Sequence, residues 1–492
     1  MKIKNIIIYG LGALILASST SCKKRFDDMN VSPNDPENAP SQLLLANVIA
    51  TTAYRMQLSA GLVVTDLWVQ HTKANTYMNE DQYSPRTDRI NTIWSNSYAV
   101  IFSDCLIAIN SANEKAQPNN EAVGYIMKAY IGYDLTTLYG DVPYSQAGDP
   151  KKFILPVYDA QPAVLNALIS DLDKAIALIG STKFSTPLEE LDTYDYIYKG
   201  DMQKWKKFAN SLKLRVYLTL TTGGIDKTAE INSLLTSGDV MQSNKDNASM
   251  PYNTTTSNPI YQWISSSRKN DFKISATMVD YLAGSSTNLS LPADKRLTVF
   301  ADTAVGGKYI GGINGDDPAD PEIFSPLSTK STTSFYNASS AFRFMTYAEV
   351  LFIAAEMDST NASKYEAAVK ASFSELGLTD ADATAALADP KFAFNPANGG
   401  KLIGEQKWVA LFGQGIEAYN SWRRTGYPKL KPAMLAATAG GVVPRRFPYE
   451  SNERVLNAAN SAAAAATLTP GVDIITAKVW FDRNHPVNFG NK

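Results

Sequence analysis

Few residues in this 492-residue chain could carry out catalysis. Its imidazoles are His71 and His485 and its thiols are Cys22 and Cys105, which is too few for a zinc site or a Cys-rich metal site. No nucleophile-elbow, zinc-protease, dithiol or phosphate-binding motif occurs. A glycoside hydrolase needs only two carboxylates, but no pair stands out among the 48 acidic residues. The sequence therefore predicts a protein that is not an enzyme, with a carboxylate-pair hydrolase as the alternative.

Aromatic side chains are plentiful instead, with 25 tyrosines, 19 phenylalanines and 7 tryptophans. Sugars present flat C–H faces that stack on aromatic rings, and hydroxyls that bond to polar side chains. Polar, loop-like stretches around 71–83 and 252–268 offer both kinds of group. We predict that the ligand-binding residues are Tyr77, Tyr83, Tyr252, Tyr261, Trp263 and Arg268. Trp68 and Trp94 have apolar neighbours and are expected in the core.

No cofactor, metal or nucleic acid is expected. The acidic stretch at 316–322 could offer oxygen ligands to Ca²⁺, but it lacks EF-hand spacing and is more typical of a solvated loop. The glycine-rich stretch at 311–315 indicates a turn, because it lacks the spacing of a dinucleotide site. With 46 basic and 48 acidic residues, the formal net charge of −2 provides no basic field for nucleic acid.

The N-terminus resembles a bacterial lipoprotein signal. Lys2 and Lys4 precede an apolar run over residues 6–17, and small residues then lead to Cys22. Cleavage would leave Cys22 as the lipidated first residue, while ordinary secretory cleavage is the alternative. No later segment reaches about 18 consecutive apolar residues, so the lipid is the expected attachment to the membrane.

Helical periodicity dominates the rest of the chain. Apolar spacings of three and four define one face on each of three predicted helices. These faces are Val164, Leu168, Leu172, Ile176 and Ile179; Trp205, Phe208, Leu212 and Val216; and Phe344, Tyr347, Leu351 and Ala354. Strand signals are short and scattered, so the predicted fold is mainly α, with separated segments compatible with several helix pairs.

The predicted organisation has three parts. Residues 1–21 form the signal peptide, and residues 22–41, which are polar and rich in proline, form the lipidated cysteine and a flexible spacer. Residues 42–492 form a single α-helical domain, with a loop-rich insertion around 241–340 where binding groups are expected. Cys105 lies in an apolar run and is expected to be a buried structural thiol.

A series of longer segments follows Cys22 in a characteristic order. They are FDDMNVSPNDP at 26–36, LYGDVPYSQA at 138–147, PVYDAQPAVLNALISDLDKAI at 156–176, YKGDMQKWKKFANSLKLR at 198–215, FRFMTYAEVLFIAAE at 342–356, QKWVALFGQGIEAYNSWRRTGYPKL at 406–430, PRRFPYESNERVLN at 444–457 and KVWFD at 478–482. Together they resemble the SusD/RagB family of outer-membrane nutrient-binding lipoproteins, nearest its SusD-like branch from Bacteroidetes-type bacteria.

The resemblance implies a fold and a role. The fold would be a scaffold of tetratricopeptide-like helix pairs with an irregular, loop-rich half that binds the ligand. The protein would be lipid-anchored in the outer membrane, facing the cell exterior over a SusC-like TonB-dependent transporter. It would capture oligosaccharides, or in some branches peptides, and deliver them to that transporter. Aromatic-rich loops favour sugar, whereas a charged groove would favour peptide termini.

Most of the matching motif residues have structural explanations. These residues are Asp141, Asn210, Arg215, Glu349, Glu417, Arg423 and Arg424. Asp141 belongs to a turn, and Asn210 and Arg215 are expected to satisfy backbone groups at a helix junction. Because a guanidinium suits a buried carboxylate, Arg423 and Arg424 are expected to pair with Glu417 or Glu349.

Overall fold

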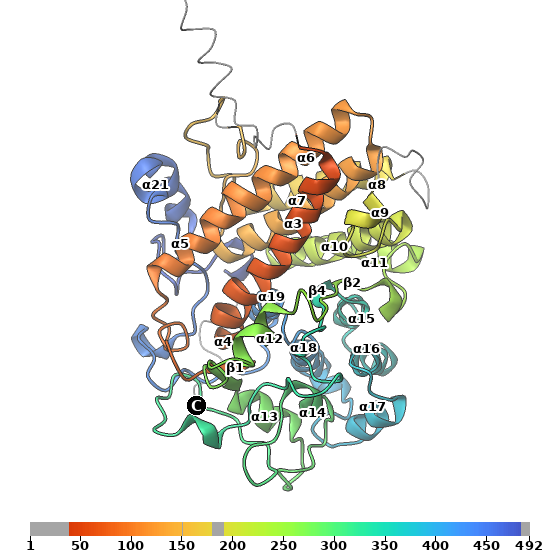
Figure 1. Cartoon of the computed structure of the whole chain (residues 1–492), viewed down its shortest axis with the longest axis vertical. Coiled ribbons are helices and arrows are strands. Elements are labelled where there is room, and N and C mark those ends of the chain that lie inside the picture. Colours follow the sequence, from red (N-terminus) through yellow and green to blue (C-terminus); the bar gives the residue numbers. More distant parts are fainter. Residues whose placement is uncertain (1–38, 150, 180–190, 484–492) are drawn as a thin grey trace, which may run out of the picture.

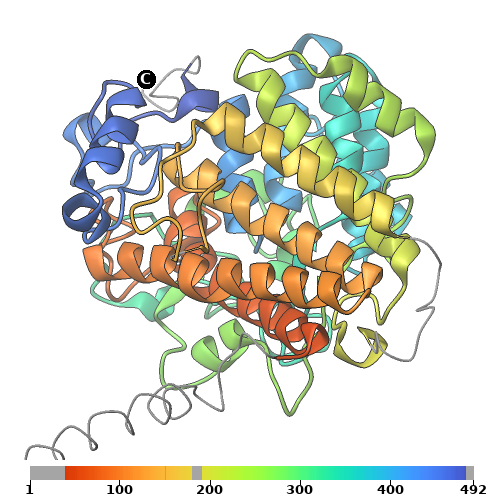
Figure 2. The same cartoon turned by 90° about the horizontal axis from the view of Figure 1, so that it is seen from above.

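The long helices of the first half of the chain pack side by side (Figures 1 and 2). The computed structural model describes residues 39–149, 151–179 and 191–483. The helical segments are α3 (Ser41–Tyr54), the π-helical η2 (Arg55–Thr65), α4 (Asp66–Trp68), α5 (Thr87–Asn96), the π-helical η3 (Ser97–Phe102), α6 (Ser103–Glu114), α7 (Pro118–Tyr139), α8 (Gln161–Leu178), α9 (Leu191–Tyr194), α10 (Met202–Thr222) and α11 (Thr228–Ser237). Successive long helices contact one another, from α6 with α7 to α10 with α11.

A second group of helices lies against the first. It contains α15 (Tyr347–Glu356), α16 (Ala362–Glu375), α17 (Asp380–Leu387), α18 (Gly399–Ala410), α19 (Gly415–Thr425), α20 (Glu453–Leu456) and α21 (Ala458–Thr467). Helices α15 and α16 pack as a pair, and α19 packs on η2 of the first group. The prediction of a mainly α fold built on paired helices is confirmed.

Two of the three predicted helix faces are largely buried as expected, although Ile176 is only half-buried and Ile179 follows the end of α8. Leu168 and Leu172 of α8 are fully buried, as are Trp205 and Phe208 of α10. Helix α10 begins after Asp201, where the helical spacing of apolar residues starts. Asp201 caps this end, since its side chain accepts a hydrogen bond from the backbone N–H of Lys204 at 3.2 Å.

The third predicted face is wrong. Phe344 lies in strand β4 (Phe342–Met345), and the helix begins only after Thr346, whose hydroxyl accepts from the backbone N–H of Glu349. The buried face of α15 therefore contains Phe352 and Ala355, whereas Leu351 is only half-buried. The spacing of three between Phe344 and Tyr347 crosses a strand–helix boundary, so it does not place the two residues on the same face of a helix.

The segment 241–340 is rich in loops, and its later part lies at the lower end of the molecule in Figure 1. Its short elements are the 3₁₀ turns η4 (Asn244–Asp246) and η5 (Pro321–Ile323), the strands β2 (Ala248–Met250) and β3 (Phe272–Ile274), and the helices α12 (Pro259–Ile264), α13 (Ala276–Leu282) and α14 (Arg296–Phe300). Strand β3 pairs with β1 (Thr72–Ala74), and β2 pairs with β4, both antiparallel. These two small sheets tie the loops to distant parts of the chain.

The core contains the residues expected there. Trp68, Trp94 and Cys105 are buried in one hydrophobic cluster that extends from Leu44 to Phe481. Burial raises the pKa of the Cys105 thiol, which keeps it protonated and unreactive. The predicted signal peptide, Cys22 and most of the predicted spacer lie outside the described residues.

One described helix, Thr87–Glu114, is long and apolar enough to cross a membrane by length and composition. It comprises α5, η3 and α6, and α6 packs against α3 and α7. A single helix of this kind is weak evidence for a span, because core helices of soluble proteins pass the same test.

Candidate functional site

Strand pairing brings the two predicted ligand-binding stretches together. Thr72 lies opposite Ile274 and Ala74 opposite Phe272 in the β1–β3 sheet. The pairing continues past the strands, because the backbone N–H of Asn75 donates to the carbonyl of Asp271 at 2.8 Å. The chain after β1, which carries Tyr77, therefore lies beside the chain before β3, which carries Trp263 and Arg268.

Trp263 is held in place by its surroundings. Helix α12, which carries it, starts at Pro259 after Asn258, whose side-chain oxygen accepts from the backbone N–H of Ile260 at 2.8 Å. The indole N–H of Trp263 donates to Asp271 Oδ2 at 2.8 Å, and the ring packs edge-on against Phe272 at 5.8 Å between centroids. Its orientation is therefore fixed without a ligand.

Tyr77 is an exposed ring on a constrained backbone. Its side chain is 61 % exposed, and its φ of 52° is a left-handed value that non-glycine residues rarely adopt. The guanidinium carbons of Arg86 and Arg268 lie 5.5 and 5.6 Å from the centre of its ring. A strained backbone at a residue whose side chain is mostly exposed is typical of functional positions.

Arg268 connects the two aromatic residues. Its guanidinium carbon lies 4.4 Å from the centre of the Trp263 ring, and its Nε lies 3.0 Å from Asp271 Oδ2. Asp271 therefore holds both the indole and the guanidinium. Arg86 is held in the same manner by the buried Glu80, with Nε to Oε1 at 3.1 Å.

The turn that carries Tyr77 is anchored to a second loop. Asp81 Oδ1 accepts from the side-chain amide of Asn314 at 2.7 Å, and Oδ2 accepts from the backbone N–H of Gly315 at 2.9 Å. Burial raises the pKa of Asp81 to about 6, although these hydrogen bonds and the nearby Lys73 lower it. The predicted turn at 311–315 thus supports the wall of the site.

These side chains line a pocket of about 110 Å³, which we call the Tyr77 pocket. Tyr77, Glu80, Arg86, Trp263, Arg268 and Asp271 are among its lining residues. It offers aromatic surfaces for C–H faces and guanidinium N–H groups for hydroxyl oxygens. Both carboxylates are paired with arginines, so neither is placed as a free acid or base. The arrangement suits binding rather than bond cleavage.

Two of the predicted ligand residues are corrected by the structure. Tyr83 is only 1 % exposed, and its hydroxyl accepts from the backbone N–H of Ala433 at 3.1 Å, so it belongs to the core. Tyr252 is also buried among core residues, and this burial raises its pKa to about 12. Tyr261 is half-buried on α12 and does not line the Tyr77 pocket, so its contact with a ligand stays a prediction.

The carboxylates Glu80 and Asp271 were not predicted. Both lie in loops. Glu80 comes six residues before Arg86, and Asp271 comes three residues after Arg268, but neither pair lies on a regular helix. The sequence therefore offers no spacing rule that would identify them as the groups that hold the arginines.

The motif residues Asp141 and Asn210 each bind a backbone group of another segment. Asp141 Oδ1 accepts from the backbone N–H of Gln161 at 2.8 Å and its Oδ2 accepts from the hydroxyl of Thr467 at 2.9 Å. The side-chain amide of Asn210 donates to the carbonyl of Asp239 at 3.1 Å. Both side chains connect elements of the scaffold.

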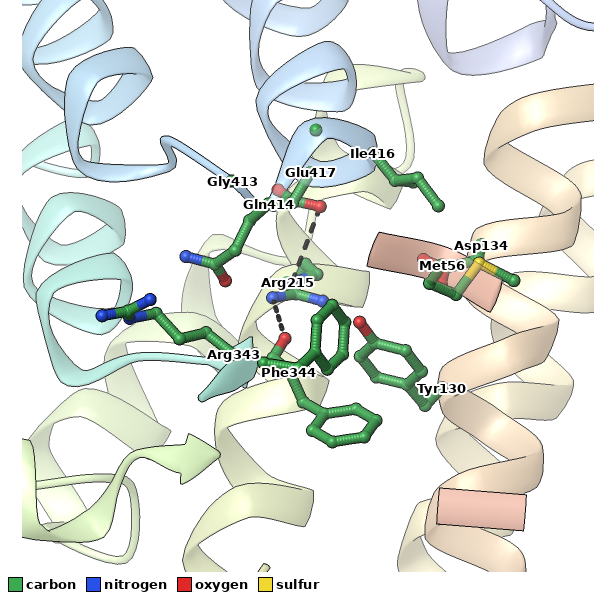
Figure 3. Close-up of a pocket in the computed structure, with 12 residues that line it drawn as sticks. Met56, Tyr130, Asp134, Arg215, Arg343, Phe344, Gly413, Gln414, Ile416 and Glu417 are labelled. Atoms are coloured by element: carbon green, nitrogen blue, oxygen red, sulfur yellow. Dashed lines mark hydrogen bonds and ion pairs between the residues drawn. The ribbon is translucent and has the colours of Figure 1, made fainter. Parts of the chain in front are cut away.

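The expected pairing of Arg423 and Arg424 with Glu417 or Glu349 is wrong. Arg215 takes both carboxylates. Its Nη2 lies 2.7 Å from Glu349 Oε2. Its Nε lies 3.6 Å from Glu417 Oε2, and Figure 3 shows this second pair. The cavity beside Arg215 holds only about 20 Å³, enough for one water molecule. This buried network is therefore structural.

Arg423 and Arg424 have other partners. Arg423 donates to the side-chain oxygen of Asn420 at 2.5 Å and to the carbonyl of Arg445 at 2.9 Å. Arg424 forms a two-point ion pair with Glu356, which also accepts from Lys407 at 2.9 Å. Burial alone would raise the pKa of Glu356, but Arg424 and Lys407 lower it to about 2.

The buried histidine and one residue of the acidic stretch are engaged with the protein. His71 is fully buried, with Nδ1 3.0 Å from Asp66 Oδ1 and Nε2 2.9 Å from the carbonyl of Trp408. In the acidic stretch, Glu322 lies 3.6 Å from Lys269. Within residues 39–149, 151–179 and 191–483, no group of three or more His, Cys, Asp or Glu could hold a metal ion.

Solved structures share this architecture along almost the whole chain. A chitin-binding protein is 26 % identical, with a TM-score of 0.76 over 90 % of this chain and 100 % of that one. A SusD homolog from Bacteroides uniformis is 23 % identical, with a TM-score of 0.77 over 92 % and 100 %. A chitin-binding SusD homolog from Flavobacterium johnsoniae is also 23 % identical, with a TM-score of 0.74 over 92 % and 98 %. At 23 % identity, the similarity shows the fold alone.

The family relationship follows from the sequence match. No curated protein matches this chain. The SusD-like family model, described as "Starch-binding associating with outer membrane", matches residues 33–450. The chain therefore belongs to the SusD-like family of non-catalytic, glycan-binding proteins that associate with the outer membrane.

Proposed function

We propose that this chain captures oligosaccharides at the Tyr77 pocket. The observation that carries the proposal is the exposed Tyr77 ring beside the oriented Trp263, with Arg86 and Arg268 next to it. A sugar ring can stack on an aromatic side chain while its hydroxyls accept hydrogen bonds from the guanidiniums. The pocket is small, so a longer ligand extends from it across Tyr77.

The membrane attachment and the partner are part of the same proposal. Cys22 at the end of a signal-like N-terminus supports a lipid anchor in the outer membrane, with the body facing the cell exterior. The resemblance to SusD/RagB proteins supports delivery of the ligand to a SusC-like TonB-dependent transporter. The family's association with the outer membrane agrees with this arrangement.

The ligands to test first are oligomers of N-acetylglucosamine, since the 26 % identical protein is described as chitin-binding. Glucose oligomers follow from the description of the family. Tripeptides test the alternative ligand class. Because Glu80 and Asp271 already pair with Arg86 and Arg268, these guanidiniums are not free counter-ions for a peptide carboxylate.

Calorimetric titration of the Cys22→Ser chain tests the proposal. We expect saturable binding of one sugar class, loss of that binding in Tyr77→Ala, and retention in Tyr196→Ala, which removes another exposed tyrosine. Saturable binding of tripeptides alone would replace the sugar by a peptide. Release of reducing ends from the bound sugar would instead favour the hydrolase alternative.

A further inference from the structure

A second cavity, of about 890 Å³, lies apart from the Tyr77 pocket. Helices α13 and α18 and the loop after α19 form its walls, and none of its lining residues lines the Tyr77 pocket. Its volume is within the range of ligand sites, about 300–1,000 Å³. The cavity can therefore hold a ligand of several rings.

Four lysines line this cavity: Lys391, Lys401, Lys429 and Lys431. We call it the lysine cleft. Lys391 follows α17, Lys401 lies on α18, and the other two lie in the loop after α19. The fold thus brings three separate segments together to place four ammonium groups around one cavity.

The acidic side chains of the lysine cleft do not balance these charges. Glu405 and Asp280 are the two carboxylates among its described lining residues, which leaves two positive charges in excess. Lys391, Lys401 and Lys429 all act electrostatically on Glu405, and Lys401 Nζ lies 3.9 Å from Glu405 Oε1. A concave site with an excess of positive charge in its lining attracts negatively charged ligands.

The lysine cleft also has apolar surface. Ile313 and Met434 are 53 % and 63 % exposed, and Pro428 and Pro432 lie beside them in the lining. Lys391 is oriented by donating to the carbonyl of Asp280 at 2.7 Å and lies 5.0 Å from the centre of the Tyr281 ring. Apolar surface between positive charges suits a ligand with C–H faces and anionic substituents.

We propose that the lysine cleft is a second binding site, for an oligosaccharide whose rings carry carboxylates. The carboxylates would lie against the lysine ammoniums and the ring C–H faces against Ile313, Met434 and the prolines. The two sites share no lining residue, although the turn at 311–315 borders the lysine cleft and also supports the Tyr77 pocket. Substitutions in the lining of one site should therefore leave the other site able to bind.

The test uses the Cys22→Ser chain and a trimer of galacturonic acid. The methyl ester of the same trimer is the matched ligand, because it keeps the rings and removes the charge. We expect 1:1 binding of the acid at low salt, weakened by about tenfold or more in the ester and at about 0.3 M NaCl. The Lys391→Gln/Lys429→Gln variant should lose about tenfold in affinity, and Lys431→Glu, at an exposed position, should lose a similar amount.

Two control variants separate the sites. Lys115→Gln, on the exposed end of α6, should bind the acidic trimer as the parent does, and so should Tyr77→Ala. Absence of binding at low salt, equal binding of the ester, or indifference to the lysine substitutions would overturn the proposal. Equal competition by inorganic phosphate would also overturn it, because it would assign the lysine cleft to small anions.

Discussion

Arg215 of α10 forms a two-point ion pair with Glu349 of α15, with Nε to Oε1 at 2.8 Å and Nη2 to Oε2 at 2.7 Å. Both side chains are buried, and Arg215 also donates to the carbonyl of Phe344 at 3.1 Å. The pair therefore joins the first group of helices to the second, at the point where β4 leads into α15. Glu417 of α19 lies close enough to share the same guanidinium.

Substitution of Arg215 is expected to destabilise the scaffold. Arg215→Met would leave Glu349 and Glu417 buried without their counter-ion, and breaking such a pair costs about 3–5 kcal/mol. Urea unfolding gives the change in the free energy of unfolding. Lys227→Met, which removes the exposed pair with Glu230, is the control and should cost less than about 1 kcal/mol. Equal stability of the two variants would show that the buried pair is unimportant.

Asp134, which lines the cavity beside Arg215, makes stability depend on pH. Burial raises the pKa of its carboxyl to about 8; Arg215 opposes this shift and Glu417 adds to it. The folded state therefore holds a proton that the unfolded chain releases near its ordinary value of 3.8. This stabilisation is complete below about pH 4 and is lost as the pH rises through about 8.

Asp134→Asn should remove that dependence, because the amide cannot ionise. Relative to the parent chain, the melting temperature of the variant should rise steadily between about pH 5 and pH 8. Asp239→Asn changes an exposed carboxylate and should show no such trend. A constant difference between Asp134→Asn and the parent across this range would contradict the raised pKa.

Local periodicity explains which parts of the fold could be predicted. The faces of α8 and α10 follow from the spacing of apolar residues within one continuous segment, so the sequence alone is enough to predict them. The start of α15 depends on Thr346 and on the pairing of β4 with a strand about a hundred positions earlier, which spacing does not reveal. The partner of Glu349 was missed for the same reason, since Arg215 is 134 residues away.

The candidate site was partly predictable from composition. Tyr77, Trp263 and Arg268 lie in polar loops, and such loops favour exposed binding groups. The same reasoning failed for Tyr83. The turn at 75–83 has positive φ at both Tyr77 and Tyr83, but only the ring of Tyr77 is exposed. The direction of a side chain in an irregular turn depends on backbone angles that residue type does not determine.

Trp263→Ala is expected to weaken binding of the oligosaccharide at the Tyr77 pocket by about 1–3 kcal/mol, the scale of stacking on flat ligand rings. Its melting temperature should change little, because the ring lies on a pocket wall and not in the core centre. Tyr83→Ala should do the opposite, lowering the melting temperature through loss of a buried ring. A large loss of stability in Trp263→Ala would place that ring in the core.

Cys22→Ala is expected to release the chain from membranes without unfolding it. The predicted spacer separates the lipid site from the helical body, and the described core begins only at Leu44. Fractionation of cells that lack the proposed SusC-like transporter measures the retention, and circular dichroism measures the fold. If the variant still pellets with membranes in such cells, attachment through a lipid on Cys22 is wrong.

Asp271 is expected to act through Trp263 and not by touching the ligand. Asp271→Ala would remove the acceptor of the indole N–H and the partner of Arg268, so the affinity for the neutral oligosaccharide should fall by about tenfold. A double-mutant cycle with Trp263→Ala separates positioning from direct contact. If Asp271 only orients the indole, its substitution costs little once the indole is absent, and the two losses are not additive. Fully additive losses would mean that Asp271 acts apart from the indole, through Arg268 or by binding the ligand itself.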